Sequence, residues 1–198
     1  LKKKKLNYTY RFFFWPETIG CIAALSNGII KPKNVEFALV STTVGLKGDI
    51  WYKKTFEGDH SIDRLIDRKM HILRKKFKPT GSDERQFSSP NIKIPTGVIT
   101  TKAYEHYKEY HTSEDNLKLI DFEVIDKMIS EYYNIIIEYD SYKKYKLVTK
   151  GCEPFLTKYN LYREIGTPGN SIDDEFRNWI IYLCDGKNNT KDISEKTG

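Results

Sequence analysis

A carboxylate follows directly after an apolar run near the start of the chain. Residues 11–15 read Arg-Phe-Phe-Phe-Trp, and the chain continues as Pro16-Glu-Thr-Ile-Gly20. Short continuous apolar runs are typical of buried strands, and α/β proteins bind ligands beyond the carboxyl ends of their strands. We therefore expect Glu17 at a strand tip that faces a crevice, where a charge is costly unless it is used. This placement favours an acid or base in catalysis, and an acid at the start of a helix is the alternative.

Two polar loops carry the other residues suited to chemistry. Gly81-Ser-Asp-Glu-Arg-Gln86 places Asp83 before an apolar stretch, and Glu109-Tyr-His-Thr-Ser-Glu-Asp115 places His111 beside hydroxyl and acid groups. Imidazole is a common zinc ligand, and a nearby carboxylate can bind the metal or orient the ring. Taken singly, Asp83 also fits a turn-forming residue and His111 a surface or capping histidine. Together with Glu17 they suggest that several sheet tips converge on one site.

Composition limits the classes of protein to which the chain can belong. It has 198 residues, of which 39% are hydrophobic and 14% aromatic, enough for one core and a small second module. No apolar run reaches the ~20 residues of a membrane span, and no signal peptide is visible, so we expect a cytoplasmic protein with no membrane partner. Cys21, Cys152 and Cys184 lack disulfide or metal spacing and fit buried thiols in a reducing compartment. The Lys-rich start at Leu1, without a methionine, indicates a fragment of a longer chain.

The net charge of +6 does not by itself indicate a nucleic-acid partner. Lysines and arginines are scattered among acidic residues, and the aromatic residues between them do not follow the pattern of an RNA-binding sheet. We therefore do not expect nucleic acid as a partner.

Predicted strands and helices alternate along the first three quarters of the chain. The strands are expected at 8–15, 35–41, 50–55 and 96–101, and the helices at 18–26, 61–76 (with Ser61 as its cap) and 121–139. This order predicts an α/β fold, with a sheet that carries helices on both faces.

Composition changes after Tyr145. A helix is expected at 173–184, Asp185-Gly-Lys ends it, and a shorter helix begins at Thr190. A helix, a tight turn and a second short helix are typical of the opening of a helix-turn-helix. We therefore divide the chain into an α/β domain at 1–150, a linker at 151–170 and the beginning of a winged helix-turn-helix module at 171–198.

Several motifs resemble one family. The segments Pro16-Glu-Thr-Ile-Gly20, Gly81-Ser-Asp-Glu-Arg-Gln86 and Tyr110-His-Thr-Ser113 are similar to the aminopeptidase-like domain of a bacterial group of polysaccharide-biosynthesis proteins. That group is in turn similar to zinc-dependent exopeptidases with two metal ions. Cys152-Glu-Pro154 and Leu183-Cys-Asp-Gly-Lys187 resemble its linker and winged-helix module. The resemblance implies a three-layer α/β domain with a mixed sheet flanked by helices, present here in part.

The resemblance also implies roles for single residues. Glu17 matches the general base of the zinc aminopeptidases, His111 matches their last metal ligand, and Asp83 is assigned as a further or compensating ligand. Thr18 and Thr42 stand where those enzymes have carboxylate ligands, and the remaining His and Asp ligands are expected upstream of Leu1. Because a threonine hydroxyl is a poor zinc ligand, we expect one zinc ion rather than two. Arg85 or Tyr110 is the candidate for stabilising the oxyanion.

Three hypotheses about function follow from these residues. The first is a zinc-dependent aminopeptidase-like hydrolase of a peptide or small amide, linked to polysaccharide biosynthesis and able to form a homo-oligomer. The second is a binding module that keeps the aminopeptidase fold without catalysis, which the threonines at 18 and 42 favour. The third is a regulator that binds DNA through the C-terminal module.

Overall fold

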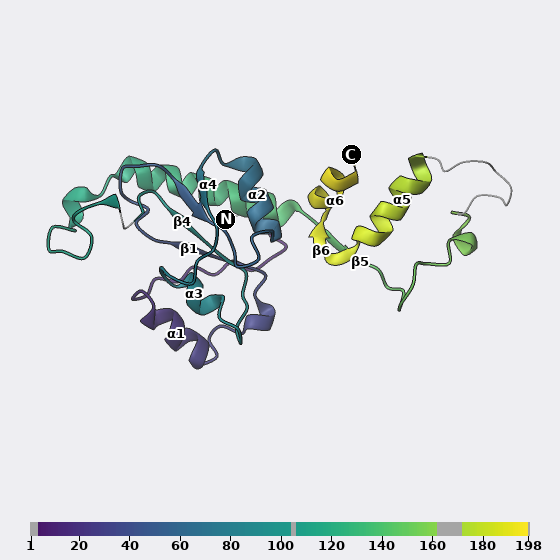
Figure 1. Cartoon of the computed structure of the whole chain (residues 1–198), viewed down its shortest axis with the longest axis horizontal. Helices are drawn as coiled ribbons and strands as arrows, with labels where there is room; N and C mark the ends of the chain where they lie inside the picture. The colour runs from purple at the N-terminus through teal and green to yellow at the C-terminus, as the bar shows by residue number, and fades with distance from the viewer. Residues whose placement is uncertain (1–3, 104–105, 162–171, 198) are drawn as a thin grey trace. The chain divides into compact units, whose positions relative to one another are not determined.

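A computed structural model describes residues 4–103, 106–161 and 172–197, and the chain divides into two compact units (Figure 1). The first unit comprises Leu1–Asp140 and the second Ser141–Gly198. This division falls earlier than the boundary that we expected after residue 150. Part of the expected linker, residues 162–171, lies outside the described residues.

A four-stranded mixed sheet forms the centre of the first unit. Its strands are β1 (Ala38–Ser41), β2 (Trp51–Lys53), β3 (Leu73–Lys75) and β4 (Thr96–Thr100), in the spatial order β1-β4-β2-β3. β1 runs parallel to β4 and β2 parallel to β3, whereas β2 and β4 are antiparallel. The central strand β4 is almost wholly buried, as expected for a strand covered on both faces. The expected α/β class with a mixed sheet is confirmed.

Helices cover both faces of this sheet, so that the unit has three layers. Figure 1 shows α2 (Ser61–Lys69) and α4 (Phe122–Ser141) on one side and α1 (Ile19–Ser26) and α3 (Glu84–Phe87) on the other. Alternate residues of β1 point to opposite layers: Val40 packs in the core of α1 and α3, whereas the Ser41 hydroxyl lies 2.5 Å from the Tyr132 hydroxyl of α4. The core under α1 and α3 consists of Cys21, Ala24, Ile30, Phe87 and Ile94.

Gly97 of β4 allows close packing on the face of the sheet that α2 and α4 cover. A Cβ atom at this position would lie 2.5 Å from the Tyr52 ring, so only glycine allows the ring to cross the strand. The Tyr52 hydroxyl then donates to Asp63 of α2 at 2.8 Å. The sheet and α2 are thus joined through a buried phenol and a buried carboxylate.

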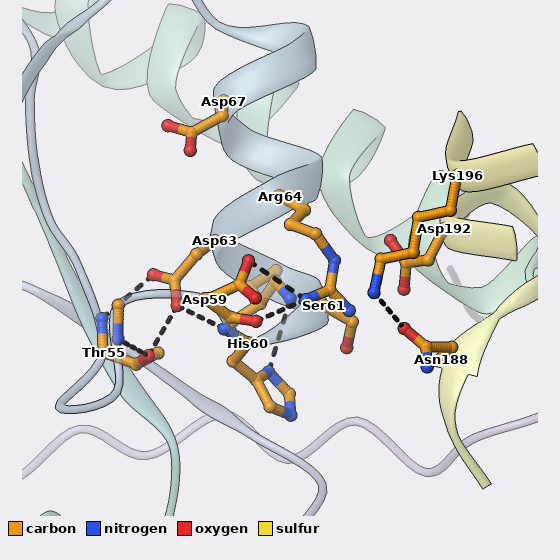
Figure 2. A network of polar contacts seen from close by, with 12 residues as sticks. Thr55, Asp59, His60, Ser61, Asp63, Arg64, Asp67, Asn188, Asp192 and Lys196 are labelled. Carbon is orange, nitrogen blue, oxygen red and sulfur yellow. Dashed lines mark hydrogen bonds and ion pairs between the residues drawn. The ribbon is translucent and has the colours of Figure 1, made fainter. Parts of the chain in front are cut away.

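Asp63 organises the loop that precedes α2. Its Oδ1 accepts from the backbone N–H of Thr55 at 2.9 Å, and its Oδ2 accepts from the Thr55 hydroxyl at 2.5 Å and from the backbone N–H of His60 at 2.9 Å, as Figure 2 shows. The His60 Nδ1 atom accepts from the backbone N–H of Ile62, so His60 caps the helix. The expected cap, Ser61, is buried, and its hydroxyl instead lies 2.7 Å from the Tyr139 hydroxyl. The prediction of Ser61 as the cap was therefore wrong.

Residues 8–15 do not form the strand that we expected. They make no ladder with another strand among the described residues, and Phe12 and Phe14 are 63% and 96% exposed. Instead, the segment is held by Asp140 at the end of the unit, whose carboxylate accepts from the backbone N–H groups of Asn7 and Tyr8. The prediction of a strand from the apolar run was therefore wrong, because an apolar composition does not supply a partner strand.

The second unit combines a short antiparallel pair of strands with two helices. β5 (Lys144–Lys146) pairs with β6 (Asp185–Asn189), and α5 (Ile172–Leu183) and α6 (Thr190–Thr197) complete it. Asn189 caps α6, because its Oδ1 accepts from the backbone N–H groups of Lys191 and Asp192. Lys196 of α6 donates to the Asn188 side chain of β6 at 3.2 Å (Figure 2). The two helices agree with the expected ones, and the winged-helix assignment stays a prediction.

The described residues also include the 3₁₀ helices Pro32–Asn34, Leu117–Leu119 and Leu156–Tyr159. Among the described helices, none has the length and apolar character required to cross a membrane.

Candidate functional site

Glu17 lies at the apex of a turn that Asp83 holds from both sides. The indole Nε1 of Trp15 donates to Asp83 Oδ2 at 2.7 Å, and the backbone N–H of Thr18 donates to Asp83 Oδ1 at 2.5 Å. Asp83 is 6% exposed, whereas Glu17 is exposed. A buried carboxylate thus fixes the residues before and after Glu17 and leaves the Glu17 side chain accessible.

The turn itself has an unusual backbone. Thr18 has φ 61° and ψ −55°, a conformation that costs a non-glycine residue about 1–3 kcal/mol. The backbone N–H of Ile19 donates to the carbonyl of Glu17 at 2.6 Å, which closes the turn tightly before α1 begins. At Gly20 a Cβ atom would lie 2.4 Å from the Trp15 ring, so glycine is required there. The Trp-Pro-Glu-Thr-Ile-Gly sequence therefore encodes a strained turn, and the Trp15 indole packs against Gly20 at the end of this turn.

Asp83 is placed by the start of α3 and shares its surroundings with a cysteine. Its carbonyl accepts from the backbone N–H groups of Gln86 and Phe87, which fixes its main chain. The buried Cys21 donates its thiol to the carbonyl of Thr18 at 3.1 Å. Burial, with the nearby Asp83 charge, raises the pKa of Cys21 to about 12. Cys21 is therefore a protonated packing residue and not a nucleophile.

His111 lies on an exposed loop. Its ring stacks on that of Tyr110, with centroids 3.9 Å apart, and its backbone has φ 58°. Burial and, next, the charge of Glu17 raise the pKa of Tyr110, so Glu17 lies within electrostatic reach of this ring. The Glu17 and His111 side chains are both exposed, and their convergence on one site stays a prediction.

The threonines at the strand ends form a network of hydroxyl groups. The Thr43 hydroxyl lies 2.5 Å from that of Thr100, and the Thr101 hydroxyl donates to the carbonyl of Thr43 at 2.7 Å. The backbone N–H of Thr42 donates to the carbonyl of Ile99 and continues the pairing of β1 with β4. The carboxyl ends of two parallel strands are therefore lined by neutral hydroxyl groups rather than by carboxylates.

The residues of this chain do not by themselves fit a zinc ion. Within the described ranges, no three His, Cys, Asp or Glu side chains converge in a way that could hold a metal. Both oxygens of Asp83 already accept hydrogen bonds, and Thr18 and Thr42 supply no charge. Asp83 therefore positions the Glu17 turn in this structure, and His111 is the candidate ligand that remains.

A buried ion pair next to Asp83 was missed by the sequence analysis. Lys53 of β2 pairs with Glu84, the first residue of α3, and also donates to the carbonyl of Thr80 at 2.5 Å. The Glu84 side chain is 1% exposed, and its Oε2 atom has no hydrogen-bond partner among the described residues. Glu84 lies in a motif that was singled out, but only the sheet topology shows that a strand lysine reaches it.

The fold is a three-layer α/β domain with a mixed sheet, and comparisons with known proteins show the family to which the chain belongs. Residues 1–141 match the family model described as "Domain of unknown function (DUF4910)", and the chain belongs to this family. The matched residues cover almost the whole first unit.

A relative from Clostridium acetobutylicum is 40% identical over 204 residues, which cover 100% of this chain and 47% of the relative. Its provisional name is polysaccharide biosynthesis protein with aminopeptidase-like domain. A crystal structure from the same organism, provisionally named a peptidase, superposes with a TM-score of 0.70 at 35% identity over 100% of this chain and 45% of that one. The chain thus spans about half the length of the relatives that it matches.

A third protein, the LapA aminopeptidase of Legionella pneumophila, is more distant. The superposition has a TM-score of 0.44 at 18% identity, and it covers 61% of this chain and 34% of the LapA chain. This likeness is too slight to support an argument.

Proposed function

We propose that this chain forms the part of an aminopeptidase-like hydrolase that carries the general base, and that the substrate is a peptide or a small amide. The observation that supports the proposal is the Glu17 turn, in which a buried aspartate holds an exposed glutamate on a strained backbone. Strained backbone that is stabilised from several sides is concentrated at functional sites. The names of the relatives agree with peptide hydrolysis.

Glu17 is proposed to accept a proton from the attacking water and to deliver it to the leaving amine. The position of the turn allows this role because the side chain is exposed while its backbone is fixed at Trp15 and Thr18. Tyr110, within electrostatic reach of Glu17, is the candidate donor to the oxyanion. A phenol is protonated at neutral pH at its ordinary pKa of 10.0, and the raised pKa of Tyr110 extends this range, as suits a donor.

Zinc is part of the proposal only in combination with residues outside this chain. Since no ligand group of three converges among the described residues, we assign His111 alone as a ligand and route no step of the reaction through the metal. Asp83 is assigned as the residue that positions the Glu17 turn.

A binding module without catalysis is the second candidate function. The neutral Thr42, Thr43 and Thr100 at the strand ends favour it, because they remove charge from the place where a metal would be held. Under this hypothesis the Glu17 turn recognises an ammonium group without activating water.

The two functions are separated by one set of measurements on the protein in its natural length. The hydrolase proposal expects stoichiometric zinc by elemental analysis and hydrolysis of at least one amino-acid p-nitroanilide. Absence of both, from a protein that is folded by circular dichroism, would support the binding module.

The substitution Asp83→Asn tests the role of the turn. It removes the charge that accepts from Trp15 and Thr18, so we expect kcat to fall by about ten- to a hundredfold while zinc content is retained. Asp49→Asn, at an exposed residue, is the control. An unchanged kcat in Asp83→Asn would show that the conformation of the turn does not matter for catalysis. Loss of zinc would show that Asp83 is a metal ligand.

A further inference from the structure

A row of aromatic rings extends along the sheet edge next to the candidate site. The aromatic row consists of Trp51, His106, Tyr107, Tyr110 and His111, all in the first unit. Trp51 stacks on His106 with centroids 6.0 Å apart and an angle of 19° between the rings. Tyr107 packs edge-on against Tyr110 at 5.6 Å, and Tyr110 stacks on His111 at 3.9 Å. The two groups of rings are linked through the chain, because His106 and Tyr107 are consecutive residues.

The sheet fixes the row near the carboxyl ends of β1 and β4. Trp51 is the first residue of β2 and pairs with Thr100, the last residue of β4. The Thr100 hydroxyl contacts that of Thr43, just beyond the end of β1. Ligands of α/β proteins bind at this edge of parallel strands, so the row lies where a substrate is expected.

The charges at the two ends of the row are opposite. At one end the charge of Glu17 acts on Tyr110, and at the other end the Lys75 ammonium lies 4.4 Å from the centre of the Trp51 ring. Lys75 forms no ion pair in the part of the chain that the structure describes, so its charge is available to a ligand. Between the ends, Lys102 lies over Tyr107, and Asp115 accepts from the Tyr107 hydroxyl. The charges of Lys102 and Asp115 are opposite in sign and offset each other. The row therefore has a negative charge at the Glu17 end and a positive charge at the Lys75 end.

We propose that the aromatic row binds an extended peptide, with its amino end at Glu17 and a carboxylate at Lys75. This inference rests on the proposed function and names its substrate class: peptides that carry a carboxylate away from the amino end. The rings pack on the apolar parts of the peptide, and the two charged ends set its direction. Lys75 is a specificity-determining residue in this arrangement, and it takes no part in the chemistry.

Binding of peptides that cannot be hydrolysed tests the proposal independently of catalysis. The probes are ketomethylene analogues of Leu-Glu-amide, Leu-Gln with a free carboxyl end, and Leu-Gln-amide, measured by calorimetry on the protein in its natural length. The first two carry one carboxylate, from the side chain or the chain end, and the third carries none. We expect one or both acidic probes to bind about three- to fivefold more tightly than the neutral probe.

The substitution Lys75→Met should abolish this preference. Lys76→Met removes the same charge at the next, exposed residue and should retain the preference. Binding should also change the tryptophan fluorescence, and Trp51→Phe should remove this signal. Equal affinities for all three probes, or a preference that survives Lys75→Met, would overturn the proposal.

Two further outcomes separate the alternatives. If maltose binds and displaces the peptides, the row is a sugar-binding surface and the assignment to peptides is wrong. If the acidic preference depends on Lys75 but the wild-type protein hydrolyses no p-nitroanilide, the peptide site stands and the hydrolase proposal fails.

Discussion

At the scale of single residues, two buried aspartates do most of the positioning in the first unit. Asp83 accepts from Trp15 and Thr18 around Glu17, and Asp63 accepts from Tyr52, Thr55 and His60 around the start of α2. Each carboxylate is buried and is stabilised by several N–H and O–H donors. Buried charges persist in proteins only when they are satisfied in this way, so their loss should be costly.

The substitution Asp63→Asn should destabilise the first unit by about 3–5 kcal/mol, because it leaves several buried donors with a poorer acceptor. Urea unfolding followed by circular dichroism measures the change. Asp59→Asn, at an exposed carboxylate on the same loop, is the matched control and should have a much smaller effect. Equal effects of the two substitutions would show that the Asp63 network does not stabilise the fold.

Stability should fall at alkaline pH. Burial raises the pKa of Cys21 from 9.0 to about 12 and that of Tyr132 from 10.0 to about 12. In the unfolded chain these groups lose their protons near their ordinary values, whereas the folded protein keeps them protonated until about pH 12. The free energy of unfolding should therefore be insensitive to these groups below pH 9 and decrease between pH 9 and 12, by up to about 1.4 kcal/mol per pH unit for each group.

Urea unfolding between pH 8 and 11 measures this slope. Cys21→Ala should make it shallower above pH 9, and Cys152→Ala, at an exposed thiol, should not. A slope that is the same in all three proteins would mean that Cys21 does not contribute to it.

The sequence allowed some of the site residues to be predicted and not others. Glu17, Asp83 and His111 could be singled out because each stands in a polar motif at the end of an apolar run. Their assignment to metal binding and catalysis stays a prediction. Lys53 and Glu84 could not be paired from the sequence, because their contact depends on which strand lies over α3.

At the scale of elements, hydrophobic patterns located most helices and strands but not their partners. The helix expected at 121–139 is α4 (Phe122–Ser141), and the strand expected at 96–101 is β4 (Thr96–Thr100). The expected helix 61–76 ends at Lys69, since β3 (Leu73–Lys75) pairs with β2. Only its pairing with β2 distinguishes this short strand from the end of a helix. The local hydrophobic pattern carries no information about that pairing.

Asp140 anchors the start of the segment that precedes Glu17. Both oxygens of the buried Asp140 accept backbone N–H groups, from Asn7 and Tyr8, and the Tyr10 hydroxyl donates to Oδ1 at 3.1 Å. Asp140→Asn should speed hydrogen exchange of the two amides by about ten- to a hundredfold. Mass spectrometry or NMR measures the exchange, with the exposed Asp126→Asn as control. Unchanged protection would show that other contacts hold the segment.

At the scale of the whole molecule, the chain divides into two compact units. The division lies between Asp140 and Ser141, and the family match also ends at residue 141. The sequence-based boundary was later because α4 leads into β5 without a glycine or proline between them. The chain spans about half the length of its relatives, so the activity of the complete protein is tested best at its natural length.

The most direct test of the account is the turnover of Glu17→Gln in the protein of natural length, at saturating p-nitroanilide. If Glu17 is the general base, kcat should fall by at least about a hundredfold while zinc content and melting temperature stay at wild-type values. Glu57→Gln, at another exposed glutamate, is the control and should retain full activity. A Glu17→Gln protein that turns over substrate at the wild-type rate would contradict the central claim.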